Sequence, residues 1–169
     1  MDKSTYYTLW FRLDQRDGYF IWISNEPDGV VLNSDKMIVV YRDFVSFTAY
    51  TIQSGVPLEQ ESPILHDLDV VQTWLSNPQH NTIDCRAFLA AWNLFDDIRA
   101  SVEPVSDSIC ASAGAEDIYD KLFFGNNLPA ITKEGMTYIP EWTSDNVAVI
   151  ADILGHRLRD FRNRLFFAD

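Results

Sequence analysis

Alternating apolar and polar residues near the start of the chain predict β-strands. In residues 5–13 an apolar residue occupies every second position, from Tyr7 to Leu13, which is the period-2 pattern of a strand. Further strands are expected at residues 19–24, 30–32, 36–42 and 44–53. The strands together predict an antiparallel β-meander. Its first hairpin loop covers residues 14–18, where Gly18 can adopt a positive φ.

Both faces of this predicted sheet carry large apolar side chains. With that loop, the alternation places Trp10, Phe20 and Trp22 on the face opposite Leu9, Phe11 and Ile21. Two explanations are open: helices cover both faces, or one face meets a partner. Core aromatic residues are the commoner explanation of such a pattern.

The middle of the chain has the strongest helical pattern. Phe88, Trp92 and Phe95 recur at i, i+4 and i+7, with Leu89 and Ile98 beside them, so one stripe of the predicted helix is apolar. Thr82 or Asp84 begins this central helix, and Pro104 marks its latest end.

Three further helices flank the central one. Asp67 is the expected N-cap of a helix over residues 68–76. Another covers residues 115–124, with Gly125 at the position of an αL C-cap. A strand or hairpin is expected within residues 131–140. Thr143 or Ser144 then begins a long last helix, whose apolar stripe ends at Leu165.

Strands first and helices after predict an α+β fold, in which the N-terminal antiparallel β-meander packs against a C-terminal set of helices. A chain of 169 residues, 47% of them apolar, is long enough to bury a core. We therefore expect a single domain over residues 1–169, β-rich over 5–53 and mainly helical over 66–168.

The net charge of −12 argues against direct binding to nucleic acid or to an anionic membrane, because phosphates attract lysine and arginine clusters. The one cluster comprises Arg157, Arg159, Arg162 and Arg164. A helix divides these arginines between two sides, so we expect them to favour the helix C-terminus and to pair with the acidic body. Two cysteines without CxxC spacing, and no evident signal peptide or apolar run of about 18 residues, favour a cytoplasmic protein.

No nucleotide-binding or hydrolase motif occurs in the sequence, so we expect neither enzyme activity nor a cofactor. One alternative is a small enzyme that uses Cys85, whose place near a helix N-terminus could lower the pKa of its thiol. It would need a base from His66, His80 or His156. A half-buried structural cysteine is the commoner case.

The acidic loop at residues 59–69 is a second alternative enzyme site. Its carboxylates and imidazole are suitable metal ligands: Glu59, Glu61, His66, Asp67 and Asp69. Their spacing matches no metal motif, so we expect no metal there. A solvated loop leading into a helix whose first turn prefers acids explains the same residues.

Acidic residues accumulate along and after the central helix, where residues 84–120 hold eight acids between Asp84 and Asp120 but only two arginines, Arg86 and Arg99. An ordinary solvated face would explain this composition. The other hypothesis is an acidic surface for a basic partner. Its candidate partner-binding residues are Asp96, Asp97, Glu103, Asp107, Glu116, Asp117 and Asp120.

The stretch YDKLFFGNNLPAITKEGMTYIPEW, residues 119–142, resembles the immunity proteins of bacterial contact-dependent growth inhibition. The layout of a small acidic chain with strands first is similar too, and the likeness is strongest over residues 85–165. The resemblance implies a protein without enzyme activity. It would bind and neutralise the C-terminal toxin domain of a large secreted toxin, often a tRNase or DNase.

The resemblance assigns no contact residues, because these immunity proteins share no contact motif. It agrees with the charge, since nucleases present basic grooves that an acidic protein can occupy. A third hypothesis keeps the acidic surface but changes the partner: an adaptor or nucleic-acid mimic that binds a host DNA-binding protein.

Overall fold

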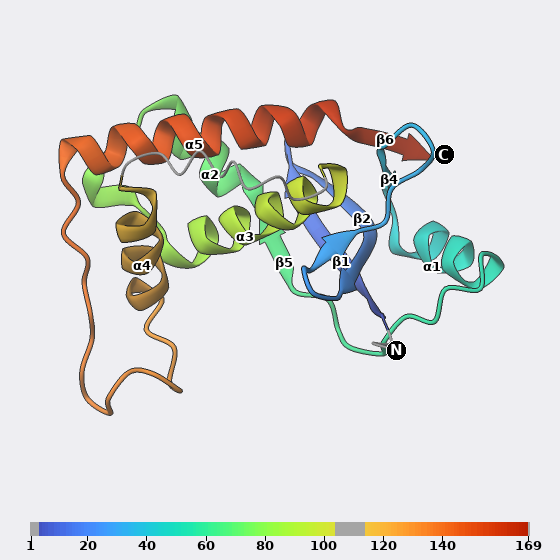
Figure 1. Cartoon of the computed structure of the whole chain (residues 1–169), viewed down its shortest axis with the longest axis horizontal. Coiled ribbons are helices and arrows are strands. Elements are labelled where there is room, and N and C mark those ends of the chain that lie inside the picture. Colours follow the sequence, from blue (N-terminus) through green and yellow to red (C-terminus); the bar gives the residue numbers. More distant parts are fainter. Residues whose placement is uncertain (1–3, 104–113, 169) are drawn as a thin grey trace.

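The computed structural model describes residues 4–103 and 114–168, which form a six-stranded sheet and five α-helices (Figure 1). The strands are β1 (Thr5–Leu13), β2 (Arg16–Ser24), β3 (Gly29–Val30), β4 (Ile38–Tyr41), β5 (Leu65–Asp67) and β6 (Leu165–Ala168). The helices are α1 (Phe44–Gln53), α2 (Leu68–Ser76), α3 (Cys85–Val102), α4 (Ala115–Gly125) and α5 (Ser144–Asn163). This mixture, with the sheet mainly N-terminal, confirms the predicted α+β class. None of the described helices combines the length and apolar character needed to cross a membrane.

The sheet has the strand order β5-β1-β2-β4-β6, with β3 also paired to β2. β1, β2 and β4 pair antiparallel, as expected of a meander, whereas β5 and β6 join the two edges in parallel. The sequence pattern predicted neither edge strand. Leu165, expected in the stripe of the last helix, lies in β6 because α5 ends at Asn163.

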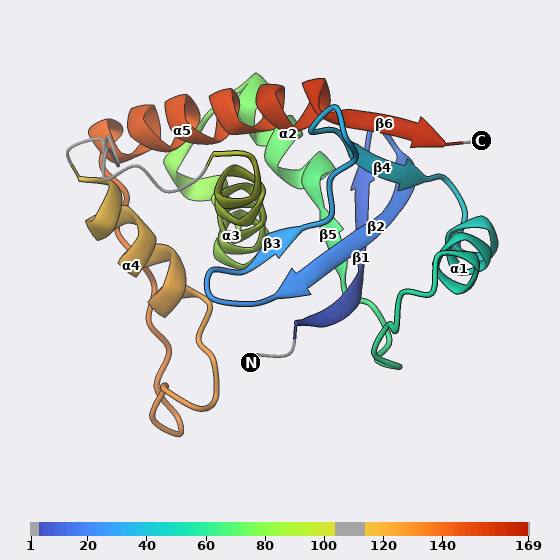
Figure 2. The ribbon, with the colours of Figure 1, turned by 45° about the vertical axis from the view of Figure 1, so that its right-hand side comes forward.

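Helices α2, α3 and α5 cover one face of the sheet (Figures 1 and 2). Phe161 of α5 joins the layers, since its ring centroid lies 5.1 Å from that of Phe11, 6.4 Å from Phe20 and 5.8 Å from Phe95. The predicted apolar stripe of the central helix is confirmed: Phe88, Leu89, Trp92, Phe95 and Ile98 are all buried.

The predicted assignment of side chains to the two faces is wrong for β2. Leu9 pairs with Phe20 and Tyr7 with Trp22, so these four side chains share the helix-covered face. Trp10 pairs with Tyr19 on the other face. The cause is the hairpin turn, which contains two residues instead of the predicted five. When the length of a loop changes by an odd number of residues, every side chain of the second strand moves to the other face.

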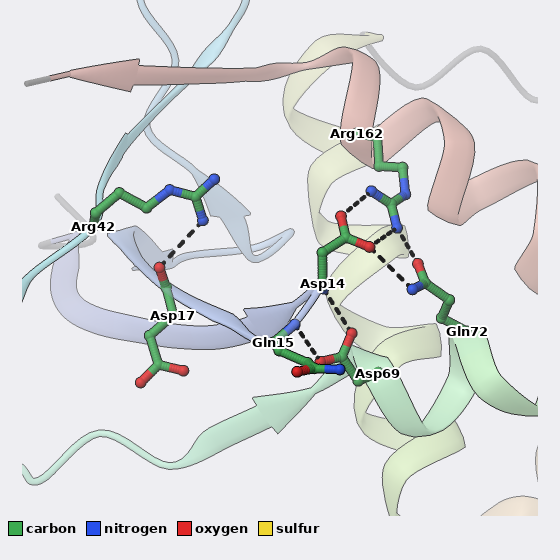
Figure 3. Close-up of polar contacts among 7 residues, drawn as sticks. All are labelled: Asp14, Gln15, Asp17, Arg42, Asp69, Gln72 and Arg162. Carbon is green, nitrogen blue, oxygen red and sulfur yellow. Dashed lines mark hydrogen bonds and ion pairs between the residues drawn. The ribbon is translucent and has the colours of Figure 1, made fainter.

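The turn between β1 and β2 consists of Asp14 and Gln15, with φ of 55° and 59°. Both backbone N–H groups donate to the carboxylate of Asp69 in α2, at 2.7 and 2.8 Å (Figure 3). Gly18, predicted in the hairpin loop with a positive φ, lies within β2 instead, and its φ is not positive. A Cβ at that position would lie 2.5 Å from the ring of Phe11, so the position has no room for a side chain.

The side chain of Asp14 ties this turn to two helices (Figure 3). Its carboxylate accepts hydrogen bonds from Arg162 Nη2 at 2.9 Å and Gln72 Nε2 at 3.0 Å. The bond from Arg162, followed by that from Gln72, holds the pKa of Asp14 well below its usual range. The network fixes the hairpin against α2 and α5.

Residues 44–53, predicted as a strand, form helix α1 instead. Asp43 caps it by accepting a hydrogen bond from the N–H of Ser46 at 2.8 Å. Phe44 and Phe47 lie three residues apart, on the side of the helix that meets Tyr19. Helix α1 therefore covers part of the second sheet face. This explains why the side chains beneath it are apolar.

Candidate functional site

A cleft of about 690 Å³ lies between the helix-covered face of β1 and β2, the segment 61–66, and helices α3 and α4. Four carboxylates line it: Asp28, Glu61, Asp96 and Asp97. Tyr7, Trp22 and Tyr119 supply aromatic walls. No lysine or arginine is among the described residues of its lining, so the cleft suits a cationic group.

Asp97 is a half-buried carboxylate of this cleft. Its Oδ2 accepts a hydrogen bond from the indole Nε1 of Trp22 at 2.9 Å. Burial raises the pKa of Asp97, the bond from Trp22 opposes this effect, and the neighbouring Asp28 and Asp96 raise it further. Through this bond the side chain of Asp97, in α3, reaches Trp22 of strand β2.

Asp96 also lines the cleft, but it has cationic neighbours. Its Oδ1 lies 3.0 Å from Arg157 Nη2 and 3.4 Å from Arg99 Nη2. The Arg157 guanidinium also lies over the ring of Trp92, 4.8 Å from its centroid. Burial lowers the pKa of Arg157, and Asp96 opposes that shift. Asp96 thus fixes α5 against α3 as well as facing the cleft.

Helix α4 brings a second group of predicted residues beside the cleft. Glu116, Asp117 and Asp120 are exposed on it, and Asp117 forms an ion pair with Lys121 at 3.4 Å. Tyr119 lies among them and donates a hydrogen bond to Asn93 Oδ1 of α3 at 3.0 Å. This bond joins α4 to the wall of the cleft.

Of the predicted residues that the structure describes, Asp96 and Asp97 line the cleft, whereas Glu103, Glu116, Asp117 and Asp120 are not part of the lining. Glu103 is exposed at the C-cap of α3, and Asp107 lies outside the described residues. Sequence reasoning missed Asp28, and it considered Glu61 only in the acidic loop at residues 59–69, not together with Asp96 and Asp97; both residues come from loops far from α3 in the chain. No local pattern marks these two positions, because only the tertiary fold brings them to Asp97.

His66 of β5 is the only imidazole among the described residues that line the cleft. Its Nδ1 lies 3.2 Å from the carbonyl oxygen of Ile64. Burial lowers the pKa of His66, so the ring is neutral at pH 7 and adds no positive charge. The lining is therefore negative at neutral pH.

The structure describes the residues of the two alternative chemical sites, which are Cys85 and the acidic loop at residues 59–69. Burial, followed by the charge of Asp84, raises the pKa of the Cys85 thiol, so the suggested lowering by the helix N-terminus is wrong. Asp67 caps α2 and Asp69 holds the hairpin turn. Within residues 4–103 and 114–168, no three His, Cys, Asp or Glu side chains are grouped to hold a metal ion. Arg157 and Arg162 pair with Asp96 and Asp14, as expected for the C-terminal arginines.

The segment 126–142 projects from the end of α4 (Figure 1). It is irregular, so the strand or hairpin predicted at residues 131–140 is wrong. Gly125 is not an αL cap either: α4 includes it, and Asn127 takes the positive φ of 49°. Gly125 instead leaves room for Cys85 and Pro140, whose atoms a Cβ there would meet at 2.6 and 2.7 Å.

Asn127 gives this projecting segment a defined shape. Its Nδ2 donates to the carbonyl oxygens of Gly125 and Tyr138, both at 2.9 Å, and its Oδ1 accepts from the N–H of Tyr138 at 2.7 Å. Six apolar side chains are exposed on and beside this segment: Phe124, Leu128, Ile131, Met136, Tyr138 and Ile139. Four of them, Phe124, Ile131, Met136 and Tyr138, line an apolar hollow of about 340 Å³.

No family model matches the chain, and no match is found among the curated proteins or the solved structures.

Proposed function

We propose that the protein is an immunity-type inhibitor that binds the basic toxin domain, a nuclease, of a contact-dependent growth inhibition system. The observation that carries the proposal is the cleft, in which four carboxylates meet aromatic walls and no described lining residue is a lysine or arginine. The resemblance over residues 119–142 supports the same class, since this stretch includes Tyr119, the residue through which α4 reaches the cleft.

Cationic side chains of a nuclease are the proposed occupants of the cleft. Such enzymes hold phosphates with lysine and arginine, and these groups would meet Asp97 in a site that is partly shielded from water. A guanidinium can also stack on Trp22 or Tyr7. Opposite charges on the two proteins would accelerate encounter and select the cognate toxin.

Apolar contacts from α4 and the projecting segment would supply much of the affinity. Phe124 follows Asp120 by four residues and Asp117 by seven, so the three lie along one side of α4. The acidic part of this side leads directly to the apolar hollow beside Phe124. A partner with basic side chains next to an apolar protrusion would match this order, because buried apolar anchors dominate most interfaces.

The proposal requires a gene for a large secreted protein beside this one, and the test uses the C-terminal domain of that protein. We expect it to form a stoichiometric complex whose affinity falls as salt is added. A triple variant removes three charges from the cleft: Asp28→Asn, Glu61→Gln and Asp97→Asn. It should weaken binding by about tenfold or more and make the salt dependence shallower.

A control variant removes the same number of charges from exposed positions that are not part of the cleft lining: Asp35→Asn, Asp152→Asn and Asp160→Asn. Calorimetry should find its affinity close to that of the unmodified chain. Equal losses in both variants would show that only net charge matters. Absence of binding to the neighbouring domain would overturn the toxin partner. Specific capture of a host DNA-binding protein through the cleft would then favour the adaptor hypothesis.

A further inference from the structure

Strand β6 forms one edge of the sheet, at the end of the molecule opposite α4 (Figures 1 and 2). It pairs with β4 on one side, and no strand of the described residues pairs with its other side. An uncovered edge presents free backbone donors and acceptors, and proteins commonly protect such edges with charges, proline or a bulge. Residues 165–168 contain none of these protections.

The pairing with β4 decides which backbone groups face outward. Ile38 donates its N–H to the carbonyl oxygen of Arg164 at 2.8 Å, and the register places Ile38 beside Leu165. In a parallel ladder every second residue directs its backbone groups to the neighbour. Arg164, Phe166 and Ala168 therefore face β4, and Leu165 and Phe167 direct their N–H and C=O groups outward.

The side chains at this edge are apolar and accessible. Phe166 is 51% exposed and Phe167 is 38% exposed. The guanidinium of Arg42 lies 3.7 Å from the centroid of the Phe167 ring, which helps to hold this ring in place. Phe44, Val45 and Ile52 of the nearby helix α1 are exposed at the same end of the molecule (Figure 2). The edge thus combines unpaired backbone with an apolar surface.

We propose that β6 pairs antiparallel with β6 of a second copy of this chain, about a two-fold axis. Only outward-facing residues can exchange hydrogen bonds in such a ladder. Full overlap therefore places Leu165 opposite Phe167 of the second copy and Phe166 opposite its own equivalent. The two sheets become one continuous sheet across the axis.

Self-complementarity is the reason for naming a second copy as the occupant. In this register Phe166 meets Phe166 on the α1 side of the sheet, a non-hydrogen-bonded pair in which side chains approach closely. Arg164 lies opposite Ala168, so no like charges face each other along the strand. Helices α3 and α4, which form one wall of the acidic cleft, lie away from this edge (Figure 1), so the carboxylates of α3 and α4 are not forced together.

The first test measures mass by light scattering over a concentration series. We expect the chain to approach twice its 19.4 kDa, and the Phe166→Asp variant to remain a monomer because it opposes two carboxylates at the axis. Phe124→Asp is the matched control, since Phe124 is 50% exposed at the other end of the molecule, and it should still dimerise. Circular dichroism checks that both variants fold.

The second test examines the register by disulfide formation with diamide, in a chain whose Cys85 and Cys110 are replaced by serine. Phe166→Cys should form a covalent dimer quickly, because its equivalents face each other. Phe124→Cys should not. A dominant Phe167→Cys dimer would overturn the proposed register. A monomeric chain at high concentration, or a Phe166→Asp variant that folds and still dimerises, would overturn the interface.

Discussion

Asp96 and Asp97 are neighbours in the sequence but experience opposite electrostatic environments. Asp96 lies 3.0 Å from Arg157, a half-buried cation whose Nη1 has no hydrogen-bond partner among the described residues. Asp97 accepts a hydrogen bond from Trp22 but forms no ion pair within residues 4–103 and 114–168, and burial raises the pKa of its carboxyl. The two carboxylates should therefore contribute to stability with opposite signs.

We predict that Asp97→Asn stabilises the protein at pH 7. A raised pKa means that the folded state binds more protons than the unfolded chain, so stability falls as pH rises above the ordinary aspartate value. The amide removes this cost while its oxygen can still accept from Trp22. We expect a gain of up to about 1 kcal/mol, or roughly 2–4 °C in Tm, that disappears at pH values below about 3.9. Thermal melts across pH measure it.

Asp96→Asn provides the matched comparison for this prediction. It leaves Arg157 without its carboxylate partner, and we expect a loss of about 1 kcal/mol because the pair is only partly exposed. A loss of stability in both variants would contradict the assignment for Asp97. A stabilised Asp97→Asn variant that also binds the toxin less tightly would show that the charge of Asp97 lowers the stability of the fold but strengthens binding.

The β1–β2 hairpin gives a prediction at the scale of an element. Gln15 has a φ of 59°, which is unfavourable for a residue with a Cβ, whereas Asp-Gly suits a two-residue turn with both φ values positive. Gln15→Gly should therefore stabilise the protein by about 0.5–1 kcal/mol. Urea unfolding measures this, with an unchanged m-value.

Gly18→Ala tests the other glycine argument in the same hairpin. The new Cβ would lie 2.5 Å from the buried ring of Phe11 and 2.9 Å from Val40 Cγ1. Overpacking of this kind costs about 1–3 kcal/mol. If Gly18→Ala were neutral and Gln15→Gly destabilising, the turn would lie near Gly18, as the sequence alone suggested.

Elements with local start signals were predictable from the sequence. Asp67, Asp84 and Thr143 each cap a helix where the pattern indicated. Residues 44–53 misled because β-branched and aromatic residues favour strands, whereas the Asp43 cap and the packing of Phe47 on the sheet favour helix. Strand β5 has only three residues, too few for a recognisable period, and depends on β1 for its formation.

The candidate site was only partly predictable for a similar reason. Acidic composition around α3 pointed to Asp96 and Asp97, and both line the cleft. Their different environments depend on Trp22 and Arg157, which are 75 and 61 residues from Asp97 and Asp96 in the chain. Only tertiary structure shows that, in the part of the chain that is described, Asp96 is paired with a cation and Asp97 is not.

At the scale of the whole molecule, two surfaces with different chemistry lie at opposite ends (Figure 1). One end carries α4 and the projecting apolar segment, with the acidic cleft between α4, α3 and the sheet, and the other end carries the β6 edge and the exposed side of α1. Because neither surface includes residues of the other, occupation of one should not obstruct the other. The proposed toxin site and the proposed dimer interface should therefore act independently.

This separation predicts a complex of two inhibitors and two toxin domains. The Phe166→Asp variant should instead bind one toxin domain per monomer with unchanged affinity, because additivity holds for distant sites without shared partners. Light scattering of the purified complexes measures the stoichiometry, and calorimetry measures the affinity. A folded Phe166→Asp variant that loses toxin affinity would place the toxin at the β6 edge, and a cleft variant that becomes monomeric would contradict the separation of the two surfaces.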